Sequence, residues 1–173
     1  TSCETVVAAL PPLGMIPAVV PEFKGLTIGG SIQGLAAESS SFKYGFVHDC
    51  VKSFDTLLAD GRRLKCSQSE NTELFHAIPG SFGSLGVCTK ATILCMRATP
   101  WVEVTLRRHS SHQAAIDYMA TLQDSTLVGN SASSRGGAPP ITFLEGLGFS
   151  EGYFATIEGR FVTEPSRGTP SRH

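Results

Sequence analysis

The segment Leu26 to Gly45, LTIGGSIQGLAAESSSFKYG, constrains the fold of this 173-residue chain more than any other. It is rich in glycine and serine, yet Ile28, Ile32 and Leu35 recur at helical spacing. Its two adjacent glycines carry no Cβ atoms at the point where that helix would begin. The segment therefore predicts a glycine turn that leads into a short helix.

This turn has two possible roles. Gly29 and Gly30 would let free N–H groups approach an anion at the positive end of the helix, so a pyrophosphate could be held without a lysine or a metal ion. Alternatively, the glycines would only allow the helix to pack close to a neighbouring strand. The spacing G-G-x-x-x-G, which ends at Gly34, matches neither the dinucleotide motif nor the phosphate loop. The segment by itself leaves both roles open.

The rest of the chain predicts an α+β fold with short elements. Further helices are expected over residues 1–10, 69–78 and 110–123. Strands are expected over residues 17–20, 50–59, 62–66, 87–96, 101–107, 143–149 and 153–162. Asp60-Gly61 favours a type I′ hairpin turn, and Ile116, Met119 and Leu122 are expected to face inward from the last helix.

Composition excludes several classes of function. With 14 basic and 15 acidic residues, the net charge of -1 offers no basic surface for nucleic acid. The most apolar stretch, Val6 to Pro21, is too short for a membrane span and is interrupted by prolines. The sequence has no initiator methionine or basic leader, so we expect it to begin inside a longer protein.

The cysteines and histidines predict no metal site. Five cysteines without a CxxC pair indicate buried free thiols in a reducing compartment, namely Cys3, Cys50, Cys66, Cys88 and Cys95. His109 and His112 have ligand-like spacing but lack a Glu or Cys partner nearby. Because Cys3 and Cys50 are the thiols nearest the glycine-rich segment and lie well outside it in sequence, no covalent attachment of a bound group through a cysteine is expected.

Side chains of the glycine-rich segment suggest how an anion would be bound. No nucleophile elbow encloses Ser39, Ser40 and Ser41, so their hydroxyls are expected to donate to phosphate oxygens. Glu38 would be repelled by a pyrophosphate unless it faced away or bonded a cofactor hydroxyl, and we expect a structural role for it.

Three phrases together indicate a family. AAESSSFKYG, LADGRRLKCSQSEN and LFHAIPGSFGSLG occur in this order, and the ensemble resembles the FAD-binding domain of the vanillyl-alcohol oxidase type. It resembles more closely the Δ24-sterol reductases, including the plant Diminuto proteins, over most of residues 13 to 165. Residues 131–140 and the C-terminal TPSRH depart from that pattern.

The resemblance implies an FAD-binding PCMH-type subdomain with a mixed sheet and short flanking helices. Residues 1–100 would form the second half of that domain, and residues 101–162 would begin a substrate-side domain, with a linker at 124–140 and a disordered tail at 163–173. In this family a loop like Thr27 to Ser40 wraps the pyrophosphate, Tyr44-Gly45 closes the turn and Leu85 to Val87 borders the adenosine. The expected cofactor-binding residues are Thr27, Ile28, Gly29, Gly30, Ser31, Ile32, Gln33, Gly34, Leu35, Ala36, Ala37, Glu38, Ser39, Ser40, Tyr44, Gly45, Gly86 and Val87.

The implied reaction is reduction of the C24=C25 bond of a sterol side chain by NADPH through non-covalent FAD. Tyr44, Tyr153 and Glu145 are conceivable proton donors, and the sequence selects none of them. The parent protein would sit at the endoplasmic reticulum membrane, facing the cytosol, through an anchor that precedes this sequence. Two alternatives stay open: a flavin oxidase or dehydrogenase acting on a sugar, alcohol or hydroxy acid, and a non-catalytic fragment or interaction protein.

Overall fold

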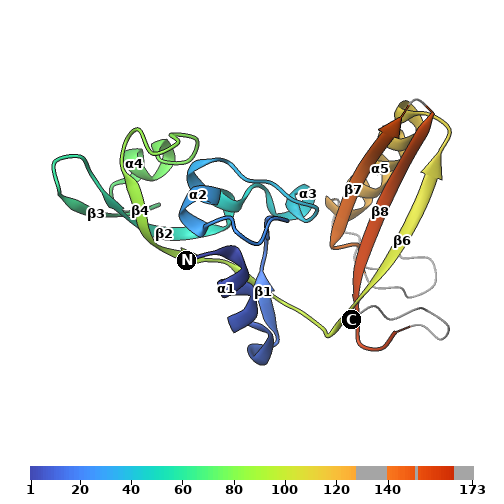
Figure 1. The fold of residues 1–173 in the computed structure, drawn as a ribbon, viewed down its shortest axis with the longest axis horizontal. Coiled ribbons are helices and arrows are strands. Elements are labelled where there is room, and N and C mark those ends of the chain that lie inside the picture. Colours follow the sequence, from blue (N-terminus) through green and yellow to red (C-terminus); the bar gives the residue numbers. More distant parts are fainter. Residues whose placement is uncertain (128–139, 151, 166–173) are drawn as a thin grey trace. The chain divides into compact units, whose positions relative to one another are not determined.

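The computed structural model describes residues 1–127, 140–150 and 152–165 (Figure 1). The chain divides into two compact units between Arg97 and Ala98. Both are α+β with small antiparallel sheets. None of the helices among the described residues is long and apolar enough to span a membrane.

The first unit combines short helices with two small sheets. Its helices are α1 (Cys3–Ala9), η1 (Pro11–Leu13), α2 (Ile28–Gln33), α3 (Ser41–Tyr44), η2 (Val47–Cys50) and α4 (Thr72–Ala77). Its strands are β1 (Met15–Pro17), β2 (Val51–Leu57), β3 (Arg63–Ser67), β4 (Val87–Ile93) and β5 (Cys95–Arg97). The sheet orders are β3-β2-β4 and β1-β5.

The expected mixed sheet is wrong for the described residues, where every strand pairing is antiparallel. Strands β2 and β3 are joined by five residues, which is too short for the crossover that parallel neighbours need. The hairpin was therefore predicted correctly, but its turn was not. A type I′ turn needs positive φ at both central residues, and in this turn only Gly61 has one, at +85°. The Gly61 N–H donates to Leu58 O at 3.0 Å, as in a type I turn with a glycine bulge.

Two other boundaries differ from the expectation because of contacts distant in sequence. The strand expected over 87–96 is broken at Leu94, whose N–H donates to Cys50 O and whose carbonyl accepts from Ala18 N. The strand expected over 17–20 lies instead at β1, paired with β5. At the N-terminus, Ser2 rather than Thr1 caps α1, since its Oγ accepts from Thr5 N at 3.2 Å.

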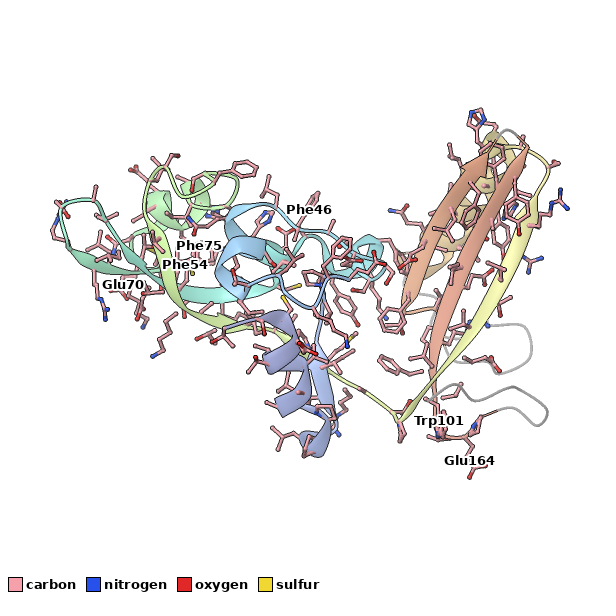
Figure 2. All side chains as sticks on the ribbon, viewed as in Figure 1. Phe46, Phe54, Glu70, Phe75, Trp101 and Glu164 are labelled. Atoms are coloured by element: carbon pink, nitrogen blue, oxygen red, sulfur yellow. The ribbon has the colours of Figure 1, made fainter. Side chains whose placement is uncertain are left out.

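The core of the first unit lies between its three-stranded sheet and helices α2 and α4. Ile32 of α2 and Ile78 after α4 are fully buried. The rings of Phe54 and Phe75 stack with centroids 5.2 Å apart, and Figure 2 shows them side by side. Helix α4 ends before Pro79-Gly80 as predicted; Asn71 precedes it, but its side chain donates to Lys65 O instead of capping the helix.

The second unit is a three-stranded sheet with one helix. Strands β6 (Trp101–His109), β7 (Phe143–Ser150) and β8 (Tyr153–Val162) lie in the order β6-β8-β7. Helix α5 (His112–Leu127) packs on the sheet, as Figure 1 shows. The predicted β7–β8 hairpin is confirmed by its antiparallel register.

Helix α5 corrects two expectations. It runs to Leu127, so the first residues of the expected linker at 124–140 are helical, while 128–139 lie outside the described residues. Most of the expected tail, 166–173, also lies outside them. Ile116 is 54% exposed and Ala115 is buried in its place, so the inward position expected for Ile116 is wrong. Met119 faces the sheet as expected, since a Cβ at Gly146 of β7 would lie 3.0 Å from its sulfur. Ser111 caps the helix, since its Oγ accepts from Ala114 N at 3.1 Å.

Candidate functional site

The first turn of α2 uses most of its own N–H donors within the protein. Thr27 precedes the helix, and its Oγ1 accepts from Gly30 N at 3.1 Å while its carbonyl accepts from Ser31 N at 2.9 Å. The Ile28 N–H donates to the Thr1 carbonyl at 3.1 Å. The predicted short helix is confirmed, but Gly29 and Gly30 lie within its first turn and not in a turn before it. This first turn offers few donors for an anion.

The adjacent glycines of α2, Gly29 and Gly30, allow close packing. A Cβ atom at Gly29 would lie 3.1 Å from the Cys88 carbonyl oxygen of β4, and one at Gly30 would lie 2.9 Å from Thr27 Oγ1. Gly29 therefore lets α2 approach β4, and Gly30 leaves room for the cap. Of the two roles considered for the turn, these contacts support close packing against a strand.

The Gln33 side chain joins α2 to the start of β4. Its Nε2 donates to Gly86 O at 2.8 Å, and its Oε1 accepts from Cys88 N at 3.3 Å. Phe82 N also donates to the Gln33 carbonyl, at 3.3 Å. These bonds bring the glycine-rich segment beside the distant phrase PGSFGSLG. The buried Gln33 amide is thus engaged with the protein itself, which the sequence did not indicate.

The loop after α2 holds the donors that its first turn lacks. Within the described part of the chain, the backbone N–H groups of Leu35, Ala37 and Ser39 make no hydrogen bond. Leu35 has a φ of +55°, unusual for a residue with a branched side chain, and the preceding Gly34 is exposed. Exposed N–H groups of a loop with left-handed backbone can form a concave anion site.

A second strained loop lies against the first. Gly80, Phe82 and Gly83 have positive φ, and a Cβ at Gly80 would lie 3.2 Å from the Leu35 side chain. Phe82 is 80% exposed, so its φ of +50° is not explained by burial of its ring. Left-handed non-glycine residues are concentrated at functional sites. The expected site included Gly86 and Val87 but not residues 80–83. The two glycines of that second loop, Gly80 and Gly83, were visible in the sequence and could have indicated it.

Glu38 and Ser40 are engaged inside the first unit. The Glu38 Oε1 accepts from Glu22 N at 2.7 Å, which supports a structural role for this carboxylate. The Ser40 hydroxyl donates to the Ala18 carbonyl at 2.7 Å, and Ser40 is buried. The expected donation from this hydroxyl to a phosphate is therefore wrong. Ser41 Oγ accepts from Glu38 N at 2.9 Å, which leaves Ser39 at the half-buried edge of the loop.

The remaining expected site residues are spread over the same unit. Tyr44 packs against the core, and Gly45 has a φ of +77° where the chain turns after α3. Gly86 fits tightly, since a Cβ there would lie 2.6 Å from Thr56 Cγ2. Val87 is 55% exposed at the start of β4. Ile32 lies in the core and Ala36 packs against it, so the contribution of either to a site can only come from the backbone.

One thiol lies closer to the glycine-rich segment than its position in the sequence suggested. Cys3 Sγ lies 3.8 Å from Ser31 Oγ, directly behind α2. Cys3, Cys50 and Cys66 are free and buried, as predicted, while Cys88 and Cys95 are partly exposed. Burial, aided by the charge of Asp49, raises the pKa of the Cys50 thiol, which keeps it protonated and unreactive at neutral pH.

The second unit contains a buried polar cluster that sequence reasoning missed. Glu158 of β8 is 4% exposed, and its Oε1 accepts from the Tyr118 hydroxyl of α5 at 2.6 Å. Arg107 Nε lies 3.7 Å from the same oxygen, and Arg160 Nη2 lies 3.3 Å from Oε2. Burial and the bond to Glu158 raise the pKa of Tyr118. The cluster ties helix to sheet.

The conceivable proton donors of the second unit and the two histidines at the start of α5 each have their own contacts. Tyr153 is 37% exposed beneath Arg108, whose Cζ lies 5.2 Å from its ring centroid, and Glu145 is half-buried on β7. His109 Nε2 lies 3.0 Å from Thr156 Oγ1, while the His112 ring packs against Phe154.

Comparison with known proteins gives a consistent match. No protein-family model matches the chain. It is 40% identical over 103 residues to the Delta(24)-sterol reductase of Rattus norvegicus, covering 60% of this chain and 20% of the relative. The corresponding enzyme of Pisum sativum is 38% identical over 97 residues, 56% of this chain and 17% of the relative. Cytokinin dehydrogenase 5 of Arabidopsis thaliana is 31% identical over 80 residues, 46% and 15% respectively.

The chain thus spans about a fifth of the length of the Delta(24)-sterol reductases that it matches. The resemblance expected from the three sequence phrases is confirmed as similarity to a segment of these proteins.

Proposed function

We propose that this chain is part of an FAD-dependent oxidoreductase and contributes to the site that holds the FAD pyrophosphate. The observation that carries the proposal is its 40% identity to Delta(24)-sterol reductase over 103 residues. The bonds of the Gln33 side chain support it, because they hold the glycine-rich segment beside the end of the phrase LFHAIPGSFGSLG. A ligand could touch both segments at once.

The residues present fit an anionic group at the loop after α2. The N–H groups of Leu35, Ala37 and Ser39 would hold phosphate oxygens. The Glu38 side chain is tied to the protein, since its Oε1 accepts from Glu22 N. The pyrophosphate is therefore assigned to the loop after the helix, rather than to the six-residue helix itself.

When bound, FAD would supply the hydride-transfer chemistry, as flavins do in other oxidoreductases. The residues of this chain would bind and orient it. The exposed Phe82 beside the loop would cover apolar surface of the cofactor and exclude water. We further propose that the parent protein lies at the endoplasmic reticulum membrane and reduces the C24=C25 bond of a sterol with NADPH.

The domain assignment follows from the same proposal. Residues 1–100 would form the second half of a PCMH-type FAD domain, and residues 101–162 would begin the substrate-side domain. An isolated alkene needs a proton as the hydride arrives, so a donor must lie near the substrate. Neither Tyr153 nor Glu145 is selected by its surroundings for that role.

The test uses the longer parent protein. It should be purified, examined for flavin absorbance, and assayed for NADPH-dependent reduction of desmosterol. Bound flavin with desmosterol reduction is the expected result. Bound flavin without that activity would contradict the sterol reductase assignment, and a folded parent without flavin would contradict the oxidoreductase proposal altogether.

A second candidate is a flavin dehydrogenase or oxidase of the same broad class. The match to cytokinin dehydrogenase 5 favours it, because one fold can serve several reactions. Oxidation of an alcohol, sugar or hydroxy acid, with transfer of electrons to oxygen and no use of NADPH, would identify this alternative. A non-catalytic fragment or interaction protein is the third candidate, identified by folded parent protein that binds no flavin.

A further inference from the structure

Strand β6 ends in the basic residues Arg107-Arg108-His109, Ser110 follows the strand, and α5 begins two residues later. We propose that Ser110 is a phosphorylation site for an arginine-directed serine/threonine protein kinase. Such kinases read their substrates by charge pattern, binding arginines two and three residues before the target serine in acidic pockets. Arg107 and Arg108 occupy those positions.

The fold places Ser110 where a kinase can reach it. Strand β6 lies at an edge of the β6-β8-β7 sheet, and its last pair with β8 joins His109 to Phe154. Ser110 is the first residue beyond that ladder and is exposed. The residues before it are extended, which is the form in which a kinase cleft takes its substrate. Ser110 itself belongs to no strand pair, while Arg107, Arg108 and His109 pair with β8 along one edge of β6 and leave its other edge open among the described residues.

Both arginines keep part of their side chain exposed. The Arg107 Nε lies 3.7 Å from the Glu158 carboxylate and its Cζ lies 4.8 Å from the Tyr118 ring centroid, yet the side chain is 50% exposed. Arg108 is exposed on the other side of the strand, with its Cζ 5.2 Å from the Tyr153 ring centroid. These contacts leave exposed surface on both side chains, so both arginines can bind acidic groups of another protein.

The neighbouring serine is a natural control. Ser111 Oγ accepts from Ala114 N at 3.1 Å and caps α5, so this oxygen already has a partner. The Ser110 hydroxyl makes no hydrogen bond to another residue of the described ranges. The structure thus distinguishes Ser110, whose hydroxyl is free to react, from the adjacent Ser111, whose Oγ caps the helix.

The reaction is transfer of the γ-phosphoryl group of ATP. The bond between the γ-phosphorus and the bridging oxygen breaks, a bond from Ser110 Oγ to phosphorus forms, and ADP leaves. The hydroxyl proton passes to the base of the kinase. The product places a phosphate just before the cap of a 16-residue helix, beside His112, where the positive end of the helix stabilises negative charge.

The test uses the folded 173-residue chain with Mg-ATP and the catalytic subunit of a cyclic-AMP-dependent protein kinase. Intact and tandem mass spectrometry should show one phosphate, on Ser110. S110A should remove it and S111A should keep it, with circular dichroism confirming that both variants are folded. R107A and R108A should each lower the initial rate at least about tenfold, because each removes a charge pair with the kinase.

Phosphate on another residue, or none on the folded chain, would overturn the proposal. So would equal rates for the arginine variants and the parent sequence, or phosphorylation that appears only after unfolding. A second measurement tests the placement: phosphorylated protein should melt at a higher temperature than unmodified protein in low salt, and the difference should shrink in high salt. A lower melting temperature would contradict a phosphate at the start of α5.

Discussion

The side-chain amide of Gln33 bridges Gly86 and Cys88, donating to the carbonyl of the first and accepting from the N–H of the second. Gln33 is 8% exposed, so both bonds lie in the protein interior. One side chain thereby fixes α2, the loop after it and the start of β4 relative to one another. The candidate site depends on this arrangement.

Replacing Gln33 should therefore destabilise the protein. In Gln33→Ala the Gly86 carbonyl and the Cys88 N–H lose their partner, and we expect unfolding free energy to fall by about 1–3 kcal/mol. Urea denaturation followed by circular dichroism measures the loss. Gln68→Ala, at an exposed position, is the matched control and should change stability little. Equal stability of both variants would show that the bridge contributes nothing.

Gly86→Ala should also destabilise the protein. Its Cβ would lie 2.6 Å from Thr56 Cγ2 and 2.9 Å from the Leu57 carbonyl oxygen, so β2 or the loop must move. Such overpacking costs about 1–3 kcal/mol. Gly25→Ala is the control, because a Cβ there meets no atom within 4 Å. A thermal melt that shifts for Gly86→Ala but not for Gly25→Ala is the expected result.

The placement of the pyrophosphate can be tested by adding charge. Ala37→Glu, at an exposed position in the loop after α2, should weaken FAD binding by the parent protein at least about tenfold through like-charge repulsion. Ala59→Glu, in the exposed β2–β3 turn, carries the same charge change and should bind FAD normally. Flavin retained equally by both variants would place the pyrophosphate elsewhere. Gly30→Val is a poorer probe, because its side chain would disturb the Thr27 cap.

Alkaline stability should report the Tyr118–Glu158 bond. The raised pKa of Tyr118 favours its protonated form in the folded state. Its contribution is therefore complete below the pKa of tyrosine in an unfolded chain, about 10, and is lost as pH rises through the higher folded pKa. Tyr118→Phe should be less stable at neutral pH and should lose less stability between neutral and alkaline pH. Tyr153→Phe is the control, and denaturant melts across this range measure both.

Some elements were predictable from the sequence because the residues that specify them are neighbours along the chain. The β2–β3 hairpin follows from two β-prone runs around Asp60-Gly61, and α4 ends at Pro79 because proline and the following glycine cannot continue a helix. The short helix that begins at Ile28 and includes Gly29-Gly30 follows from the helical spacing of its apolar residues. The likeness to Delta(24)-sterol reductases was equally readable, since phrases of sequence carry it.

The contact partners of the candidate-site residues, by contrast, are visible only in the folded structure. Gly29 faces the Cys88 carbonyl, Ser40 donates to Ala18 and Gln33 bridges to Gly86, and each partner is distant in sequence. No local pattern encodes these pairs, because they form only when the elements pack against one another. For the same physical reason the free donors lie in the loop after α2, and not in its first turn, where the sequence had placed them.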